Sequence, residues 1–279
     1  MTFDHLHRLL DAQSLEEIWE IHTTKMAEFG FDRLLYGFTR YYSGRSYGDL
    51  DDILTLSNHP RAYLDDYLGK RLFMSGPALH QLTEGCSEIS WGPIEERFAK
   101  GLLTEAEAEV WEFNRRWDAN VGYSLGFQGI STRSVGALSL AARPGLSQDE
   151  IDEVWQREGR DIVLMNRVMH LKVSQMPYQG HRRPLTPRQI EVLEWVADGK
   201  TMQDIAQIVG LKVATVEKHL RLARETLDVE TTAQAVAKAS IMNQIFVSQP
   251  HRPAEPGEEI RDPGPFDGFT ESDRGRSEG

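Results

Sequence analysis

A short stretch towards the C-terminal end of the chain places basic side chains at helical spacing. Between Lys212 and Arg224 there are four lysines and arginines and one acid, Glu217. Lys218, Arg221 and Arg224 recur so that they share one face of a helix. A basic helical face favours contact with phosphates, although the whole chain carries a net charge of −12. The stretch therefore predicts a nucleic-acid-binding surface.

Three helices are predicted to hold these side chains in place. Thr186-Pro187-Arg188-Gln189 is typical of a helix start, with a capping box and a proline at the first helical position. That helix ends at Gly199, and a second, short helix begins at Thr201 and closes at Gly210. The third helix has an apolar face, made of Val216, Leu220, Ala223 and Leu227. Two helices, a glycine-bearing turn and a third helix with a basic face describe a helix-turn-helix.

The stretch Leu185–Ala239 also resembles the LuxR-type helix-turn-helix, without a gap. The matching residues are Leu185-Thr186, Val192-Leu193, Trp195, Gly199-Lys200-Thr201, Ile205-Ala206, Thr215-Val216, His219, Leu227 and Val229. Gln189 departs from the Glu that many members carry, but Gln also completes a capping box. A helical hairpin that binds protein is the alternative interpretation. The resemblance implies that residues 184–247 form an all-α, four-helix domain on double-stranded promoter DNA, with RNA polymerase as a possible further partner.

The resemblance also gives the basic helix a division of roles. We expect Lys218 and Arg221 to reach base edges, with Thr215 and Glu217 on the same outward surface. Glu217 would accept from a cytosine amino group or moderate non-specific binding. We expect phosphate contacts from Lys212, Thr201 and Arg224.

The family works as homodimers on two-fold symmetric sites. Small and apolar residues of the last helix would fit a dimer seam or, equally, the domain core: Ala233, Val236, Ala237, Ser240 and Ile241.

The rest of the composition narrows the class of protein. The 279 residues, 40% of them hydrophobic, suffice for one sizeable core and a small domain. A single cysteine, Cys86, excludes an internal disulfide and fits a reducing cytosol. No apolar run approaches the roughly 18–20 residues of a membrane span. The N-terminal residues are acidic and amphipathic rather than a signal peptide. These features predict a cytoplasmic protein with no membrane association.

Residues 1–173 predict helices on both sides of an antiparallel sheet. Helical patterns cover residues 3–10, 14–30, 61–73, 93–100, 104–116 and 147–173. Extended patterns cover residues 34–42, 52–57, 88–91, 123–130 and 135–141, and the last two form a hairpin. The predicted fold class is α+β, an N-terminal α/β/α sandwich followed by the all-α domain. Residues 174–183 read as a linker. Residues 248–279 hold five of the twelve prolines and predict disorder.

Roughly residues 5–170 also resemble, more loosely, the autoinducer-binding domain of LuxR-type quorum-sensing regulators. His59 stands at the Tyr position of the family's N-Y-P motif, and Tyr63 and Tyr67 follow where the family has Trp and Tyr. Gly76 takes the place of the family's Asp, just before Pro77. Trp91 matches the second Trp. In the sheet, Gly126 and Gly136 match two glycines. The resemblance implies a small diffusible signal of the acyl-homoserine lactone type, bound between the sheet and one helical layer.

Each matching residue is thereby assigned an expected role. Tyr67 would flank the acyl chain and reach a polar group with its hydroxyl. Trp91 would donate its indole N–H to a lactone carbonyl. Gly126 would let the sheet backbone approach the ligand. We also assign Ala142, His59, Tyr63 and Gly76 to the ligand site. The alternative for the aromatic residues is plain core packing.

Gly76 is the most informative departure from the family pattern. The family's Asp accepts a hydrogen bond from the ligand's amide, which a glycine side chain cannot do. An unpaired buried amide costs roughly 1–3 kcal/mol. This position therefore predicts a ligand other than an ordinary acyl-homoserine lactone, an altered pose, or a regulator that works without ligand.

Other functions find less support in the sequence. It contains no G-x-S-x-G, P-loop, G-x-G-x-x-G or paired Cys/His cluster, so no enzyme is predicted. Asp51-Asp52 could mark a phosphate receiver, but the alternating βα pattern of a receiver is absent. No other metal-ligating residue stands at ligand spacing from His59, and we predict neither a metal site nor a cofactor. The sequence predicts a ligand-responsive transcriptional regulator.

Overall fold

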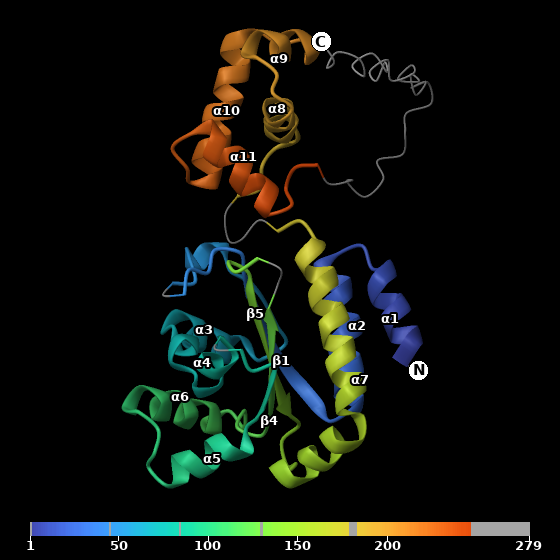
Figure 1. Ribbon diagram of the computed structural model, residues 1–279, viewed down its shortest axis with the longest axis vertical. Helices are drawn as coiled ribbons and strands as arrows, with labels where there is room; N and C mark the ends of the chain where they lie inside the picture. Colours follow the sequence, from blue (N-terminus) through green and yellow to red (C-terminus); the bar gives the residue numbers. More distant parts are fainter. Residues whose placement is uncertain (1, 45, 84, 129–130, 179–182, 247–279) are drawn as a thin grey trace, which may run out of the picture. The chain divides into compact units, whose positions relative to one another are not determined.

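A five-stranded antiparallel sheet organises the N-terminal part of the chain (Figure 1). The structure is a computed structural model that describes residues 2–44, 46–83, 85–128, 131–178 and 183–246. The strands lie in the order β2-β1-β5-β4-β3. Their bounds are Phe31–Thr39 (β1), Leu54–Ser57 (β2), Glu88–Ser90 (β3), Gly122–Gln128 (β4) and Val135–Ala142 (β5).

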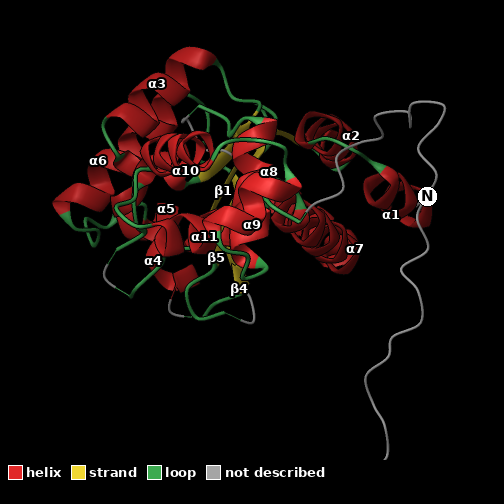
Figure 2. Cartoon of the chain, turned by 90° about the horizontal axis from the view of Figure 1, so that it is seen from above, coloured by secondary structure: helices red, strands yellow, loops and turns green. Residues whose placement is uncertain are grey.

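Helices cover both faces of this sheet. One face carries α1 (Thr2–Asp11), α2 (Leu15–Glu28) and α7 (Gln148–Gln175). The other carries α3 (Arg61–Gly69), α4 (Pro77–Thr83), α5 (Gly92–Ala99) and α6 (Glu105–Arg116), with single turns at Leu50–Asp52 (η1) and Leu72–Ser75 (η2). Figures 1 and 2 show the two helical layers on opposite sides of the strands. The predicted α/β/α sandwich is confirmed.

Side-chain caps set several helix starts. Ser147 with Glu150, and Thr104 with Glu107, form reciprocal capping boxes at α7 and α6. At the start of α2 a capping box is only half formed. Ser14 accepts from the Glu17 N–H, but the Glu17 carboxylate accepts from the backbone of Gln13 instead.

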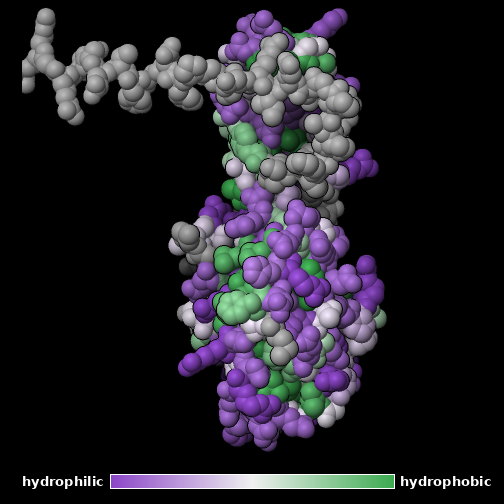
Figure 3. All heavy atoms as spheres, turned by 90° about the vertical axis from the view of Figure 1, so that its right-hand side faces the viewer, coloured by the Kyte–Doolittle hydropathy of each residue, from purple (hydrophilic) through white to green (hydrophobic). Residues whose placement is uncertain are grey.

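The main hydrophobic core lies between the sheet and the layer of α1, α2 and α7. Alternate strand residues point into it, and Leu34, Tyr36, Leu138 and Leu140 are fully buried. The outer surface of this helical layer, viewed in Figure 3, carries scattered apolar side chains among polar ones. The large exposed ones on α1 and α7 are Phe3, Leu10, Leu164 and Leu171.

Three local predictions differ from the structure. The first strand was placed at residues 34–42, but β1 runs from Phe31 to Thr39. The helix expected over residues 61–73 breaks after Gly69, because Arg71 adopts a left-handed conformation with φ of 55°. The short helix α4 was not predicted at all.

The C-terminal part of the chain is all-helical. It consists of α8 (Pro187–Ala197), α9 (Met202–Ile208), α10 (Val213–Leu227) and α11 (Thr232–Ile241). Capping boxes open α8 at Thr186, α9 at Thr201 and α11 at Thr231. The four predicted inward residues Val216, Leu220, Ala223 and Leu227 are all buried in one core. The predicted helix-turn-helix is confirmed.

The segments between and after these parts are only partly described. Helix α7 continues to Gln175, two residues into the stretch predicted as a linker. Residues 179–182 of that stretch lie outside the described residues. The predicted disorder of residues 248–279 also falls on residues that the structure does not describe.

Candidate ligand pocket and DNA-binding face

A cavity of about 400 Å³ lies between the sheet and the helices α3, α4 and α6. This volume is within the range of small-molecule sites, roughly 300–1,000 Å³. On the sheet side five of the lining residues are small, Gly37, Thr55, Ser124, Ala137 and Ser139, and they lie beside the larger Leu35 and Val135. The space exists because these strand positions leave the helices nothing bulky to pack against.

Strand register brings the small residues together. Gly37 of β1 is opposite Thr55 of β2 and Ala137 of β5, and Ser139 of β5 is opposite Ser124 of β4. Because side chains alternate across a strand, the residues between them face the main core instead. A Cβ added at Gly37 would meet no atom within 4 Å, so this position opens into the cavity.

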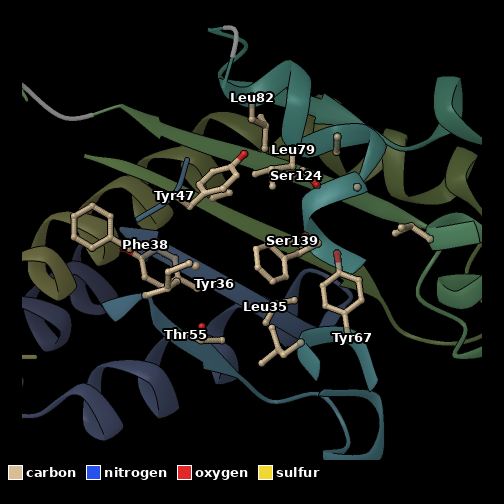
Figure 4. A pocket seen from close by; sticks show the side chains of 18 of the residues that line it. Leu35, Tyr36, Phe38, Tyr47, Thr55, Tyr67, Leu79, Leu82, Ser124 and Ser139 are labelled. Atoms are coloured by element: carbon tan, nitrogen blue, oxygen red, sulfur yellow. The ribbon is translucent and has the colours of Figure 1, made fainter. Parts of the chain in front are cut away.

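The opposite wall is largely apolar and aromatic. It includes Tyr67, Phe73, Leu79, Leu82, Trp91, Val110, Trp111 and Asn114. In Figure 4, Tyr47 and Tyr67 stand over the strands that carry Ser124 and Ser139. Asp51 is the one charged residue among the described residues that line the cavity, and it is exposed. The cavity therefore has an uncharged interior.

The polar groups of this interior are few and specific. Trp91 donates its indole N–H to Ser124 Oγ over 2.8 Å, which leaves the Ser124 hydroxyl hydrogen free for another partner. Within the described part of the chain, the hydroxyls of Tyr67 and Ser139 make no hydrogen bond. Burial raises the pKa of Tyr67 to about 12, so its phenol remains a neutral donor and acceptor.

The structure places three of the expected ligand residues, Tyr67, Gly76 and Trp91, on the cavity lining. An ideal Cβ at Gly76 would lie 3.8 Å from the Tyr67 hydroxyl oxygen, so a longer side chain there would reach the same end of the cavity. The expected donation from Trp91 to a ligand carbonyl is taken up by Ser124 in this structure.

The other expected ligand residues lie behind the wall. His59 stacks on Tyr63 with ring centroids 4.3 Å apart, and Tyr63 donates to Asn114 Oδ1 over 3.1 Å. Burial lowers the pKa of His59 to about 4, so its ring is neutral at physiological pH. Ala142 is buried and pairs with Phe31 at the far end of β1.

Gly126 serves a close approach, but the neighbour belongs to the protein. A Cβ at this position would lie 2.9 Å from the carbonyl oxygen of Cys86 and 3.2 Å from Leu82. The glycine therefore allows the chain before β3 and helix α4 to lie against the sheet. It shapes the cavity through Leu82, which lines it.

Sequence reasoning missed the sheet side of the cavity. Gly37, Ser124, Ala137, Ser139 and Asn114 were not among the expected ligand residues, although all line it. A signal was available in the period of two. Ala137 and Ser139 alternate with Leu138 and Leu140, and small residues on one face of a strand mark space on that side.

The second candidate site is the outward face of α10. Lys212, Glu217, Lys218 and Arg221 are exposed there, while Thr215 and Arg224 are half-buried. Together with Ala214 and with Met202 of α9, Glu217, Lys218, Arg221 and Arg224 line a shallow hollow. Basic groups beside a hollow on an exposed helix suit contact with a nucleic acid.

Three of the side chains expected to contact DNA, those of Arg221, Arg224 and Thr201, already have partners within the domain. Arg221 forms an ion pair with Glu225 one turn further on. Arg224 donates to Thr232 Oγ1 over 3.0 Å and so ties α10 to α11. Thr201 donates to the Asp204 carboxylate over 2.7 Å, and this bond lowers the pKa of Asp204. An expected phosphate contact by Thr201 or Arg224 would compete with these bonds.

Helix α11 separates its core residues from a second face. Ala235 and Ala239 are fully buried. Of the residues considered for a dimer seam, Ala233, Ala237, Ser240 and Ile241 are exposed, whereas Val236 is half-buried and packs against that core. The core alternative therefore describes Val236, while the other four residues leave one face of α11 exposed.

Comparison with known proteins assigns both parts. The model of the autoinducer binding domain matches residues 14–173, and that of the bacterial regulatory proteins of the luxR family matches residues 183–239. The chain belongs to the LuxR-type quorum-sensing regulators. The first match covers the cavity and the second covers the face of α10. The resemblance stated from the sequence is confirmed.

Relatives of this LuxR-type regulator align with most of its length. The transcriptional activator protein AnoR of Acinetobacter nosocomialis is 26% identical over 86% of this chain and 96% of its own. LuxR of Aliivibrio fischeri is 24% identical over 70% of this chain and 76% of its own. The solved structure of CepR2 from Burkholderia cenocepacia covers 62% of this chain and 95% of its own, with 17% identity and a TM-score of 0.47.

This LuxR-type regulator is an autoinducer-binding, DNA-binding transcription factor, in a family of regulators rather than enzymes. None of the helices in the described residues is both long and apolar enough to cross a membrane.

Proposed function

We propose that this regulator senses an uncharged, largely apolar signal molecule whose polar end carries carbonyl, ester or hydroxyl groups. The observation that supports this is the composition of the cavity. Its interior presents neutral hydroxyls and one amide, and Gly76 stands where the family's carboxylate would accept from a ligand N–H. Such a site favours ligands without an amide donor at that point.

The hydroxyls fit the polar end of such a ligand. Ser124, held by Trp91, has one hydrogen left to donate, and Ser139 lies directly opposite on β5. A carbonyl or ester oxygen placed between them would accept from both. Tyr67 lies across the cavity and offers a third uncharged partner. The apolar helices supply the contact surface for an alkyl or ring system.

An acyl-homoserine lactone in an altered pose is the second candidate. The observation in its favour is Asn114, whose side chain lines the cavity. Its Oδ1 atom already accepts from Tyr63, but an amide oxygen has a second lone pair. A lactone turned toward α6 would satisfy its amide N–H there rather than at Gly76. A regulator that acts without any ligand is the third outcome.

Promoter DNA is the target of the C-terminal domain, and we propose that the regulator binds it as a cytoplasmic homodimer. One small helix-turn-helix contacts too little DNA for high affinity by itself, and two-fold sites require two copies. The exposed face of α11, with Ile241 44% exposed, provides an apolar surface for the second copy. Contact with RNA polymerase remains part of this proposal.

The deciding experiment identifies the bound compound. Purified protein is incubated with producer-culture extract, and the retained molecule is identified by mass spectrometry. The matched control is Ala137→Leu, which fills the cavity from the sheet side. We expect wild type to retain a neutral amphiphile that the variant releases. Retention of an ordinary acyl-homoserine lactone would favour the second candidate, and equal retention by both proteins would contradict the cavity as the site.

A further inference from the structure

The exposed face at the start of α10 is not uniformly basic. Val213 is 36% exposed, and Ala214 beside it is exposed as well. On a helix, Ala214 shares a face with Glu217, Lys218 and Arg221. All four line the hollow between α9 and α10. The surface expected to face the DNA bases thus combines two apolar residues with acidic Glu217 and two basic side chains, those of Lys218 and Arg221.

Glu217 indicates what this part of the face meets on DNA. Among the described residues its carboxylate has neither an ion pair nor a hydrogen bond, because Arg221 pairs with Glu225 instead. A carboxylate facing phosphates would be repelled, so the neighbourhood of Glu217 suits base edges better than the backbone. There it can accept from the amino group of cytosine or adenine.

The two apolar residues lie one turn before Glu217. Neither Val213 nor Ala214 has a side-chain donor or acceptor, and the apolar feature of the major groove is the 5-methyl group of thymine. The short side chain of Ala214 lets a base edge come close to the helix. Val213 adds two methyl groups at the edge of the same surface.

We propose that Val213 and Ala214 read the methyl group of a thymine in the operator, next to the amino-bearing base that Glu217 contacts. Met202 of the preceding helix α9 lines the same hollow as Ala214, so this part of the surface offers a further apolar side chain to the methyl group. The proposed contact involves only the 5-methyl group of the base. It therefore distinguishes thymine from uracil, which presents the same hydrogen-bonding groups.

The test uses the full chain and a base change that removes only the methyl group. Operator sequences are first selected from a random duplex pool at fixed salt. Each thymine of the selected sequence is then replaced in turn by deoxyuridine, and affinities are measured by fluorescence anisotropy. We expect at least one position at which wild type binds about threefold to fivefold more weakly without the methyl group.

Two variants then assign the effect to the residues. Val213→Thr keeps the shape but replaces a methyl by a hydroxyl, and Ala214→Gly removes the side chain. We expect each variant to lower the thymine-to-uracil ratio toward one at that position. The control is Ile208→Thr on α9, which is 48% exposed and does not line the hollow. It should keep the wild-type ratio.

The outcomes separate this proposal from DNA binding itself. Wild type that binds the selected duplex but tolerates uracil at every position would overturn it. So would an unchanged ratio in both Val213→Thr and Ala214→Gly. Binding of all sequences with no selected motif would also overturn base reading, while leaving the DNA-binding function of the domain intact.

Discussion

Trp91 donates its indole N–H to the hydroxyl oxygen of Ser124 across 2.8 Å, in the wall of the cavity between the sheet and α3, α4 and α6. Ser124→Ala should leave a buried indole N–H unpaired, which lowers the free energy of unfolding by roughly 1–3 kcal/mol. Ser139→Ala is the matched control, because the Ser139 hydroxyl makes no hydrogen bond within the described chain. Urea unfolding of both variants without ligand measures the difference. Equal losses would contradict the bond.

We expect Gly76 to set the class of ligand in the proposed site. Gly76→Asp should strengthen binding of acyl-homoserine lactones, because the new carboxylate can accept from their amide N–H, and should weaken a ligand that presents an acceptor there. Gly69→Asp is the control, since Gly69 also lines the cavity but at another point. Calorimetry with a panel of acyl chain lengths measures both. Nanomolar lactone binding by wild type, unimproved in Gly76→Asp, would refute this role.

Two glycines on neighbouring strands should respond to alanine with opposite signs. Gly37→Ala should raise the free energy of unfolding by about 0.5–1 kcal/mol, because it restricts the unfolded chain and meets no atom within the cavity. Gly136→Ala should lower it, because the new Cβ would lie 3.1 Å from the ring of His170. Thermal and denaturant unfolding would show it. A loss in Gly37→Ala would mean that the cavity is closed there.

Arg221 is expected to reach a base edge. Arg221→Ala should cost roughly 1–3 kcal/mol of operator binding and relax specificity at one position. Arg188→Ala is the control, because Arg188 on α8 also pairs with a glutamate on its own helix, Glu191. Both are compared in a mobility-shift assay at fixed salt. Equal affinity of Arg221→Ala and wild type would remove this residue from the interface.

Stability should fall as the solution becomes acidic because buried histidines cannot take up protons. Burial lowers the pKa of His22 to about 3, and those of His5 and His170 to about 4, below the ordinary value of 6.5. The unfolded chain therefore binds more protons below pH 6.5, and stability that is present above 6.5 is lost as the pH falls toward 4. Each such histidine contributes up to about 1.4 kcal/mol per pH unit.

The variant His22→Asn tests that slope. It should flatten the dependence of the unfolding free energy on pH between 6.5 and 4.5, and His7→Asn, at an exposed position of α1, is the control for replacing a histidine. His22 bonds to Asn166 Oδ1 at 2.9 Å, so the variant also loses stability at neutral pH. The slope rather than the absolute value carries the test.

The helical C-terminal part was predictable because its signals are local. Thr186, Thr201 and the glycines after α8 and α9 act within one turn, and the capping boxes form as their spacing indicates. The order of helices and strands in the N-terminal sandwich was predictable from the same kind of local pattern. Helix α4 was missed because seven residues between Pro77 and Thr83 are too few to show a periodic face.

The cavity was less predictable because it depends on register between strands. Gly37, Ala137 and Ser139 become one surface only when β1 and β5 pair as they do. Nothing in chain order places Ser124 under the indole of Trp91. Conversely, Tyr63 matches a family position yet is tied to Asn114 behind the wall, because stacking between His59 and Tyr67 holds its ring there.

Trp91 and Trp111 are in edge-to-face contact, with ring centroids 6.3 Å apart. Their position bears on the intrinsic fluorescence of the regulator. Both indoles line the cavity, and the chain has six tryptophans. A molecule that enters the cavity changes the surroundings of two of these six fluorescent indoles, those of Trp91 and Trp111. If the cavity is the ligand site, intrinsic fluorescence should respond to the signal molecule without any label, and Trp111→Phe should reduce that response.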